Sequence, residues 1–287
     1  MRGPARKWFL YRRGEGWLRV LLLGVAVLAF GLPLIWTALA SLSVEPDNNS
    51  SPPTWSLPPS TEHYTEIGIA EPTFAEELTT STSLALLATA LTLGISFLAA
   101  YAMARSIFRG KRLLVQGFLI LACLPVMAYA VPLTDTVGHL HLEDTFIGVM
   151  LAQTAVFSPL AIYILYGYLS QVPRELEESV RLDGGSTLQV IRNVALPLAS
   201  PGLAATGIIV FVLNWNLFLV PLVLTTSRIR TIPVAMSDFF TFERELEWPT
   251  AAAALTTSLV PLVILIALAH RLLEEFRLPF SEPGSTG

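Results

Sequence analysis

The sequence predicts an all-α membrane protein, and its composition, its long apolar runs and the distribution of its basic residues support this fold class. Of the 287 residues, 53% are hydrophobic and only 14% are charged. A soluble domain usually carries about 25% charged residues, so this deficit places most of the chain in a membrane. The formal net charge of −4 gives no indication of a nucleic-acid partner.

Six apolar runs are long enough to cross a bilayer, which takes about 20 mainly apolar residues. The first run follows a basic start and contains Ala38-Leu39-Ala40, which resembles a signal-peptide cleavage site. Its apolar core is much longer than that of a signal peptide, so we interpret it as an uncleaved first span. The predicted spans are residues 18–41, 79–104, 113–133, 145–169, 198–223 and 250–270.

The basic residues predict the orientation of these spans. If the N-terminus is cytoplasmic, the outside pieces hold only Arg228, Arg230 and Arg244 of the 18 Lys and Arg residues. Because Lys and Arg near membrane segments stay on the cytoplasmic side, both termini are predicted to be cytoplasmic. The predicted organisation is an N-terminal segment at 1–17, a transmembrane domain at 18–272 with a cytoplasmic loop at 171–197, and a C-terminal tail at 273–287.

The predicted outside loops give weaker signals. Residues 43–78 carry seven acidic residues and no Lys or Arg, which suits either a solvated loop or contact with an external partner. His139, His141 and Glu143 are too few to predict a metal site. Cys123, the single cysteine, lies in an apolar run and is expected to pack there as a small side chain.

No Asp, Glu, Lys, Arg or His lies deep within the six predicted spans. Ionisable groups at that depth usually mark ion or proton pathways, so we expect neither a proton-coupled carrier nor an intramembrane enzyme, and no catalytic residues. The chain also lacks the GxxxxGK[ST] sequence of a phosphate-binding loop. Energy for any transport would therefore have to come from elsewhere.

Uncharged polar residues do lie in or near the predicted spans. Such residues either join helices by hydrogen bonds or line a polar pathway, and both interpretations stay open. The candidates for a substrate pathway are Asn214, Asn216, Gln153 and Tyr129.

The cytoplasmic segment "RELEESVRLDGGSTLQVIRNVALP" (174–197) predicts two short helices. Pro173 suits the first turn of a helix, and the acidic residues that follow favour the positive end of its dipole. Leu176 and Val180 share one face. Gly184-Gly185 stops this helix, because glycine readily adopts the left-handed terminal conformation.

A second helix is predicted to begin at Ser186, which forms a possible capping box with Gln189. Pro197 is predicted to end this helix and return the chain to the fifth span. The pair would be stabilised either by docking into another protein or by packing on its own span ends. One apolar stripe is predicted on the second helix, made of Leu188, Ile191 and Ala195.

At this point the residues resemble a known family. "ESVRLDGGS" followed by "VALP" resembles the EAA loop of the membrane subunits of ABC importers. Glu178 takes the acidic position, Ser179-Val180 replace the two alanines, and Gly184 falls at the required spacing. Val194 and Leu196-Pro197 complete the pattern.

Further patches resemble the second membrane subunit of maltose-type sugar importers. They are "AYAMARSIFRGKRLL" (100–114), "NWNLFLVPLVL" (214–224) and "TIPVAMSDF" (231–239). The resemblance covers roughly residues 80–272 and implies a multi-pass permease in a bacterial or archaeal plasma membrane.

This resemblance implies a set of partners. They are a second homologous permease subunit, two cytoplasmic ATP-binding subunits, an extracytoplasmic solute-binding protein, a sugar and the lipid bilayer. ATP and Mg²⁺ would be used by the ATPase, and this chain would bind no cofactor. The residues implied in ATPase coupling are Glu178, Asp183, Gly184, Leu176, Val180, Ser186, Leu196 and Pro197.

Two alternatives stay open. The solute could be a polyol, a phosphorylated polyol, an amino acid or a peptide instead of a sugar. The chain could also be a membrane-embedded scaffold or enzyme, in which case no ATPase or second permease would purify with it.

Overall fold

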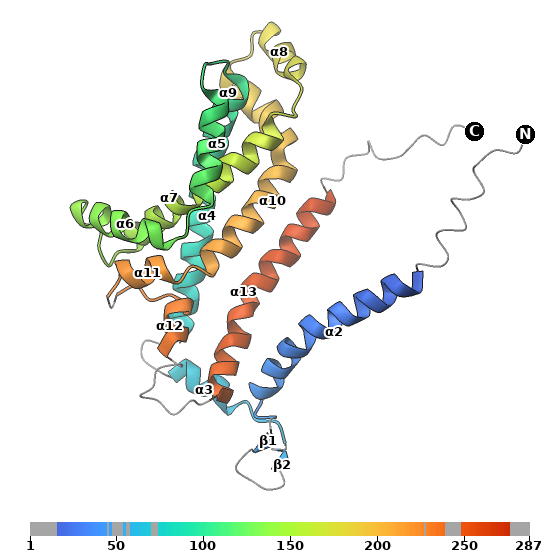
Figure 1. Cartoon of the computed structure of the whole chain (residues 1–287), viewed down its shortest axis with the longest axis vertical. Coiled ribbons are helices and arrows are strands. Elements are labelled where there is room, and N and C mark those ends of the chain that lie inside the picture. The colour runs from blue at the N-terminus through green and yellow to red at the C-terminus, as the bar shows by residue number, and fades with distance from the viewer. Residues whose placement is uncertain are drawn as a thin grey trace, which may run out of the picture. The chain divides into compact units, whose positions relative to one another are not determined.

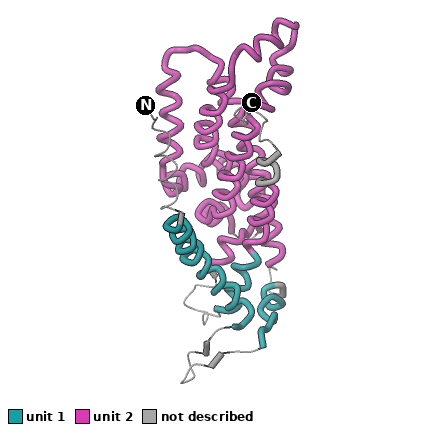
Figure 2. The backbone as a smooth tube through the Cα atoms, turned by 90° about the vertical axis from the view of Figure 1, so that its right-hand side faces the viewer, with its two compact units in different colours: residues 1–71, 242–257 teal, residues 72–241, 258–287 magenta. Residues whose placement is uncertain are grey.

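A computed structural model describes residues 16–44, 46–47, 54–55, 58–69, 74–226, 228–238 and 248–275. Figure 1 shows the helices, which make up almost all of this described part, in chain order. Two strands of two residues each, β1 (Pro46–Asp47) and β2 (Thr54–Trp55), pair antiparallel. The chain divides into two compact units, residues 1–71 with 242–257 and residues 72–241 with 258–287 (Figure 2). Most of the predicted terminal segments 1–17 and 273–287 lies outside the described residues.

The described part contains five helices long and apolar enough to cross a membrane, or six if one bent pair counts as a span. An all-α fold with several membrane spans is therefore confirmed. Four of these helices correspond to the first, second, fourth and sixth predicted spans: α2 (Gly16–Ala40), α4 (Phe74–Arg105), α7 (Phe146–Leu169) and α13 (Trp248–Glu275).

The third predicted span, 113–133, is not one straight helix. α5 (Lys111–Ala122) and α6 (Met127–His139) are bent by 97° at the break between them. Pro125 explains this break, because it disfavours helical backbone at the preceding residue and has no N–H to continue the helix. The Tyr129 hydroxyl donates to the carbonyl of Leu121 at 2.6 Å, across the bend.

The fifth predicted span, 198–223, also differs. One helical segment runs from α9 (Thr187–Val190) through a π-helical turn, η1 (Ile191–Ala195), into α10 (Leu196–Trp215). The prediction that Pro197 ends a helix is wrong, because Pro197 lies in the first turn of α10. The wider π turn before it accommodates a residue without a backbone donor. α10 ends at Trp215, and α11 (Leu219–Leu224) and α12 (Ile232–Asp238) are separate short helices.

The core of the larger unit is formed by α4, α7 and α10, which pack against one another. Gly202 allows close packing, because a Cβ there would lie 2.4 Å from the Tyr168 ring. Apolar side chains of the three helices form two buried clusters, one around Leu84, Val156 and Val210 and the other around Phe97, Leu165 and Ala199.

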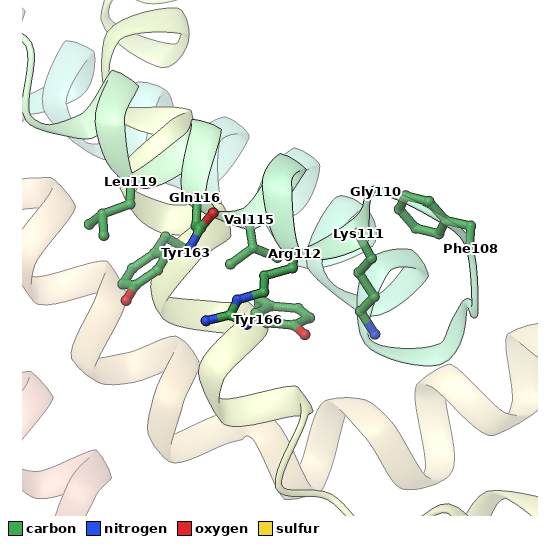
Figure 3. Close-up of a pocket in the computed structure, with 9 residues that line it drawn as sticks. All are labelled: Phe108, Gly110, Lys111, Arg112, Val115, Gln116, Leu119, Tyr163 and Tyr166. Atoms are coloured by element: carbon green, nitrogen blue, oxygen red, sulfur yellow. The ribbon is translucent and has the colours of Figure 1, made fainter.

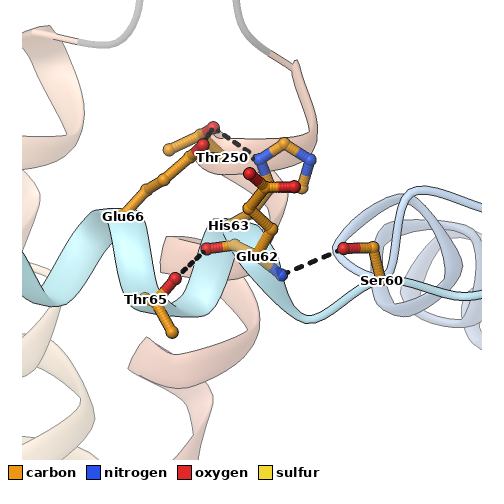
Figure 4. Close-up of polar contacts among 6 residues, drawn as sticks. All are labelled: Ser60, Glu62, His63, Thr65, Glu66 and Thr250. Atoms are coloured by element: carbon orange, nitrogen blue, oxygen red, sulfur yellow. Dashed lines mark hydrogen bonds and ion pairs between the residues drawn. The ribbon is translucent and has the colours of Figure 1, made fainter.

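In the smaller unit, α3 (Glu62–Ile69) makes polar contacts with the start of α13 (Figure 4). Nδ1 of His63 lies 2.9 Å from Oε2 of Glu66 and 3.1 Å from Oγ1 of Thr250. The Thr250 hydroxyl also donates to Glu66 at 3.1 Å. The hydrogen bond with His63, together with that from Thr250, lowers the pKa of the Glu66 carboxyl. Part of the acidic loop predicted at 43–78 is therefore an ordered helix.

Candidate functional site

The segment after α7 forms two helices joined at a glycine elbow, as predicted. α8 (Arg174–Leu182) ends where Gly184 adopts a φ of +83°, a left-handed conformation that glycine reaches without steric cost. The N–H of Gly184 donates to the Arg181 carbonyl at 3.0 Å, and that of Gly185 donates to the Val180 carbonyl at 2.8 Å. These two bonds form a Schellman motif, which satisfies the last carbonyls of α8.

The structure gives a separate role to Gly185, which was predicted as part of the helix stop but not among the coupling residues. A Cβ at Gly185 would lie 2.6 Å from both the carbonyl oxygen and Cγ1 of Val180, whereas a Cβ at Gly184 would meet nothing within 4 Å. Gly184 is therefore required for its backbone angle and Gly185 for space. Asp183 caps the end of α8 and is exposed.

The predicted capping box at the start of the second helix is present. Oε1 of Gln189 accepts from the Ser186 N–H at 2.6 Å, and Oγ of Ser186 accepts from the Gln189 N–H at 3.3 Å. Two backbone donors that the first turn would leave unpaired are satisfied in this way. The second helix therefore begins directly after the elbow.

The predicted apolar stripe of the second helix is partly wrong. Leu188 is 73% exposed and Ile191 is half-buried, while Val190 and Ala195 are fully buried. The π turn accounts for this difference, because it adds a residue to the turn and aligns positions five apart. The buried face is therefore Val190 with Ala195, which a regular helical spacing does not predict.

A buried carboxylate anchors α8 to the end of α4. Glu177 is 4% exposed, and its Oε1 lies 2.8 Å from Nε and 2.6 Å from Nη2 of Arg105. The Tyr101 hydroxyl donates to Oε2 at 3.1 Å. Nη1 of Arg105 donates to the Leu169 carbonyl of α7 at 3.2 Å. One guanidinium therefore joins α4, α7 and α8.

A second contact strengthens this attachment, since Nη2 of Arg174 donates to the Ala104 carbonyl at 3.1 Å. Sequence periodicity does not reveal the anchor, because periodicity identifies apolar faces. On α8 it predicts that the buried face is the one with Leu176 and Val180. In the structure Leu176 is exposed and Val180 is half-buried. A signal does exist in the sequence, namely Arg105 at the very end of an apolar span.

The other predicted coupling residues lie mostly on the exposed side of the two helices. Glu178 is exposed beside the buried Glu177, and Leu182, at the tip, is 88% exposed. Figure 1 shows α8 and α9 at the same end of the larger unit as the start of α10. Ser186, Leu196 and Pro197 are also exposed. An exposed apolar tip beside a carboxylate suits contact with another protein.

Two of the four pathway candidates lie inside the α4–α7–α10 core. Asn214 is 3% exposed and donates from Nδ2 to Thr89 Oγ1 at 3.2 Å. Gln153 is 1% exposed. Ser96 of α4 donates to the Ser158 carbonyl of α7 at 3.4 Å, and Arg105 further along α4 donates to Leu169 further along α7, so the two helices run parallel. Gln153, five residues before Ser158, therefore lies about level with Thr89. Among the described residues of this core, the buried oxygens without a hydrogen-bond partner are Oδ1 of Asn214, Oε1 of Gln153 and Oγ1 of Thr92.

These unpaired oxygens form a polar layer in an apolar core, where each costs free energy unless water or a ligand reaches it. The other two candidates bond locally. Asn216 is exposed and donates from Nδ2 to the Val212 carbonyl at 2.8 Å. Tyr129 braces the α5–α6 bend.

Comparison with known sequences gives one family. Residues 93–276 match the family model described as binding-protein-dependent transport system inner membrane component. The chain is 33% identical over 268 residues to the trehalose transport system permease protein SugB of Mycobacterium tuberculosis, covering 91% of this chain and 94% of that protein. It is 32% identical over 242 residues to the trehalose/maltose transport system permease protein MalG of Thermococcus litoralis, covering 83% and 86%.

A third relative is the sulfoquinovosyl glycerol transport system permease protein SmoH of Agrobacterium fabrum, 32% identical over 238 residues, covering 82% of this chain and 83% of that protein. Among solved structures, a bacterial ABC transporter that imports the acidic polysaccharide alginate matches with a TM-score of 0.72 and 19% identity, covering 94% of this chain and 98% of that chain. The MetNI methionine ABC transporter matches with a TM-score of 0.58 and 14% identity, covering 73% and 100%. These structural matches establish a shared fold.

Proposed function

This chain belongs to the family of inner membrane components of binding-protein-dependent transport systems, and we propose that it is a permease subunit of an ATP-driven importer for a sugar or oligosaccharide. The family makes it a multi-pass membrane protein and a transport component rather than an enzyme, with ATP hydrolysis in a separate subunit. The carbohydrate class is supported by relatives named for trehalose, maltose and sulfoquinovosyl glycerol.

The complex would contain a second homologous permease subunit and two cytoplasmic ATP-binding subunits that use ATP and Mg²⁺. A solute-binding protein would deliver the sugar on the outer side. A structurally similar alginate transporter in complex with a periplasmic protein bound to alginate pentasaccharide supports this arrangement. This chain would bind neither the nucleotide nor the metal.

The orientation of the chain follows from its basic residues. Both termini would be cytoplasmic, because Arg228, Arg230 and Arg244 are the only Lys or Arg residues on the other side. The elbow after α8 would then lie in the cytoplasm, on the same side as the ATPase.

The observation that carries the coupling mechanism is the division of α8 into two faces. Glu178 and Leu182 are exposed, and we assign them to the contact with the ATPase. Glu177 faces inward and is ion-paired to Arg105 at the end of α4. When the ATPase closes and displaces α8, this anchor would pass the displacement to α4 and hence to the core helices.

The polar layer at Asn214 and Gln153 is the best-supported position for a pathway within this chain. Its unpaired oxygens would accept hydrogen bonds from water or from the hydroxyls of a sugar when the core helices separate. Asn216 and Tyr129 are secondary candidates, because their side chains already bond to backbone carbonyls.

Reconstitution of the full complex in vesicles tests this function. We expect uptake of a labelled sugar, with trehalose and maltose tried first, that requires ATP on the cytoplasmic side and the solute-binding protein. Uptake of a polyol, an amino acid or a peptide without any sugar would contradict the solute class alone. Uptake by this chain without the ATPase, driven by an ion gradient, would contradict the whole proposal.

A further inference from the structure

A groove of about 770 Å³ lies between the start of α5 and α7, and it includes the turn before α5. Figure 3 shows side chains from α5 and two tyrosines from α7 around the same space. None of these residues belongs to the elbow or to the polar layer. The groove is lined by Phe108, Gly110, Lys111, Arg112, Val115, Gln116, Leu119, Tyr163 and Tyr166.

One end of the groove is cationic. Nζ of Lys111 lies 5.3 Å from the centre of the Tyr166 ring and donates to the carbonyls of Ala104 and Ser106 at 3.5 and 3.3 Å. Arg112 follows it and is exposed. Within the described ranges, neither Lys111 nor Arg112 has a carboxylate within ion-pairing distance. Two positive charges are thus left without an anionic partner in the part of the chain that the structure describes.

The rest of the groove is mostly apolar. Val115 and Leu119 lie one helical turn apart on α5 and share its face. Leu119 is eight residues after Lys111, which corresponds to about 12 Å along a helix. Tyr163 and Tyr166 line the opposite wall from α7. An occupant that fits both ends carries a negative head and an apolar tail.

We propose that this groove binds one anionic phospholipid of the cytoplasmic leaflet. The phosphate would lie at Lys111 and Arg112, and an acyl chain would lie along Val115 and Leu119. The proposal rests on the cytoplasmic orientation proposed above, which places Lys111 at the membrane surface and Leu119 in the hydrocarbon. Basic pockets between membrane helices on that side attract anionic headgroups, and phosphate oxygens accept strong bonds from Arg and Lys. A free phosphate would leave the apolar wall of the groove unoccupied.

Native mass spectrometry of the purified full chain, delipidated and then incubated with phosphatidylglycerol or phosphatidylcholine, tests the proposal. We expect the chain to retain one phosphatidylglycerol in preference to phosphatidylcholine. The double variant Lys111→Gln/Arg112→Gln should lower the affinity for phosphatidylglycerol about tenfold or more, since each basic residue near an anionic surface contributes about fivefold. The charge-preserving variant Lys111→Arg/Arg112→Lys should retain the lipid, which would show that the loss in the Gln variant follows the charges at these two positions.

Arg109→Gln/Arg192→Gln is the matched control, because it removes two exposed charges at positions that do not line the groove. An equal loss of lipid in this control, or no loss in Lys111→Gln/Arg112→Gln, would overturn the proposal. Full displacement of the lipid by soluble glycerol phosphate would also overturn it, because the site would then be a phosphate site. The assay uses neither ATPase nor solute, so its failure would leave the transport function standing.

Discussion

At the scale of single residues, Glu177 and Glu178 are adjacent yet lie in opposite environments. Glu177 is buried against Arg105 and Tyr101 of α4, and Glu178 is exposed on the other face of α8. Removing one partner of a buried ion pair leaves the other charge uncompensated. An exposed carboxylate contributes little to the stability of its own chain. The two residues should therefore differ in what they stabilise.

Glu177→Gln is expected to destabilise the isolated chain by about 1–3 kcal/mol, because a charge-assisted hydrogen bond is weakened at a buried site. In the complex, this variant should hydrolyse ATP with reduced sugar uptake per ATP. Thermal unfolding of the purified chain and parallel uptake and ATPase assays measure the two effects.

Glu178→Gln is the matched control for this prediction. It should leave the stability of the isolated chain unchanged and weaken binding of the ATP-binding subunit. Equal destabilisation by the two substitutions would show that Glu177 is not the anchor.

At the scale of elements, the elbow contains two adjacent glycines, and each position requires glycine for a different physical reason. Gly184 needs a left-handed backbone, and Gly185 needs the space over Val180. The helix stop and the capping box could be predicted from the sequence because both depend on residues within one or two turns. The burial of Val190 and Ala195 could not be predicted from the sequence. The π turn shifts the helical register, and no local residue type marks that turn.

Substitutions in the elbow test the backbone conformation at Gly184 and the space at Gly185 separately. Gly184→Asn should keep most coupled uptake, because Asn tolerates the left-handed conformation, while Gly184→Val should lose it. Gly185→Ala should also lose it, because even a methyl group would meet the Val180 carbonyl. The measurement is sugar uptake per ATP hydrolysed, with surface expression as the control for membrane insertion. Normal coupling in Gly185→Ala would show that the close approach to Val180 is not required.

At the scale of the whole molecule, long apolar helices could be predicted because a bilayer leaves few other ways to satisfy the backbone. The 97° bend between α5 and α6 was missed, because proline is often tolerated within a membrane helix and the sequence alone does not show where it breaks one. The Glu177–Arg105 anchor joins residues 72 positions apart, so the position of Arg105 at the end of a span marks one partner and no local pattern identifies the other. Orientation relative to the membrane is a property of the whole charge distribution and can be tested directly.

Cysteine labelling tests this orientation on a chain whose single native cysteine, Cys123, is first replaced by Ser. In that background, Glu178→Cys should react with a membrane-impermeant maleimide in inside-out vesicles and stay unlabelled in intact cells, because α8 is proposed to be cytoplasmic. Glu62→Cys, at the exposed start of α3, is the matched control and should show the opposite pattern. Both positions are exposed in the structure, and the chain is expressed without its ATP-binding subunit, so a lack of reaction on one side reports the membrane barrier and not burial. Labelling of residue 178 in intact cells would show that the proposed topology is inverted. The elbow would then lie outside the cell, where it could not contact a cytoplasmic ATPase.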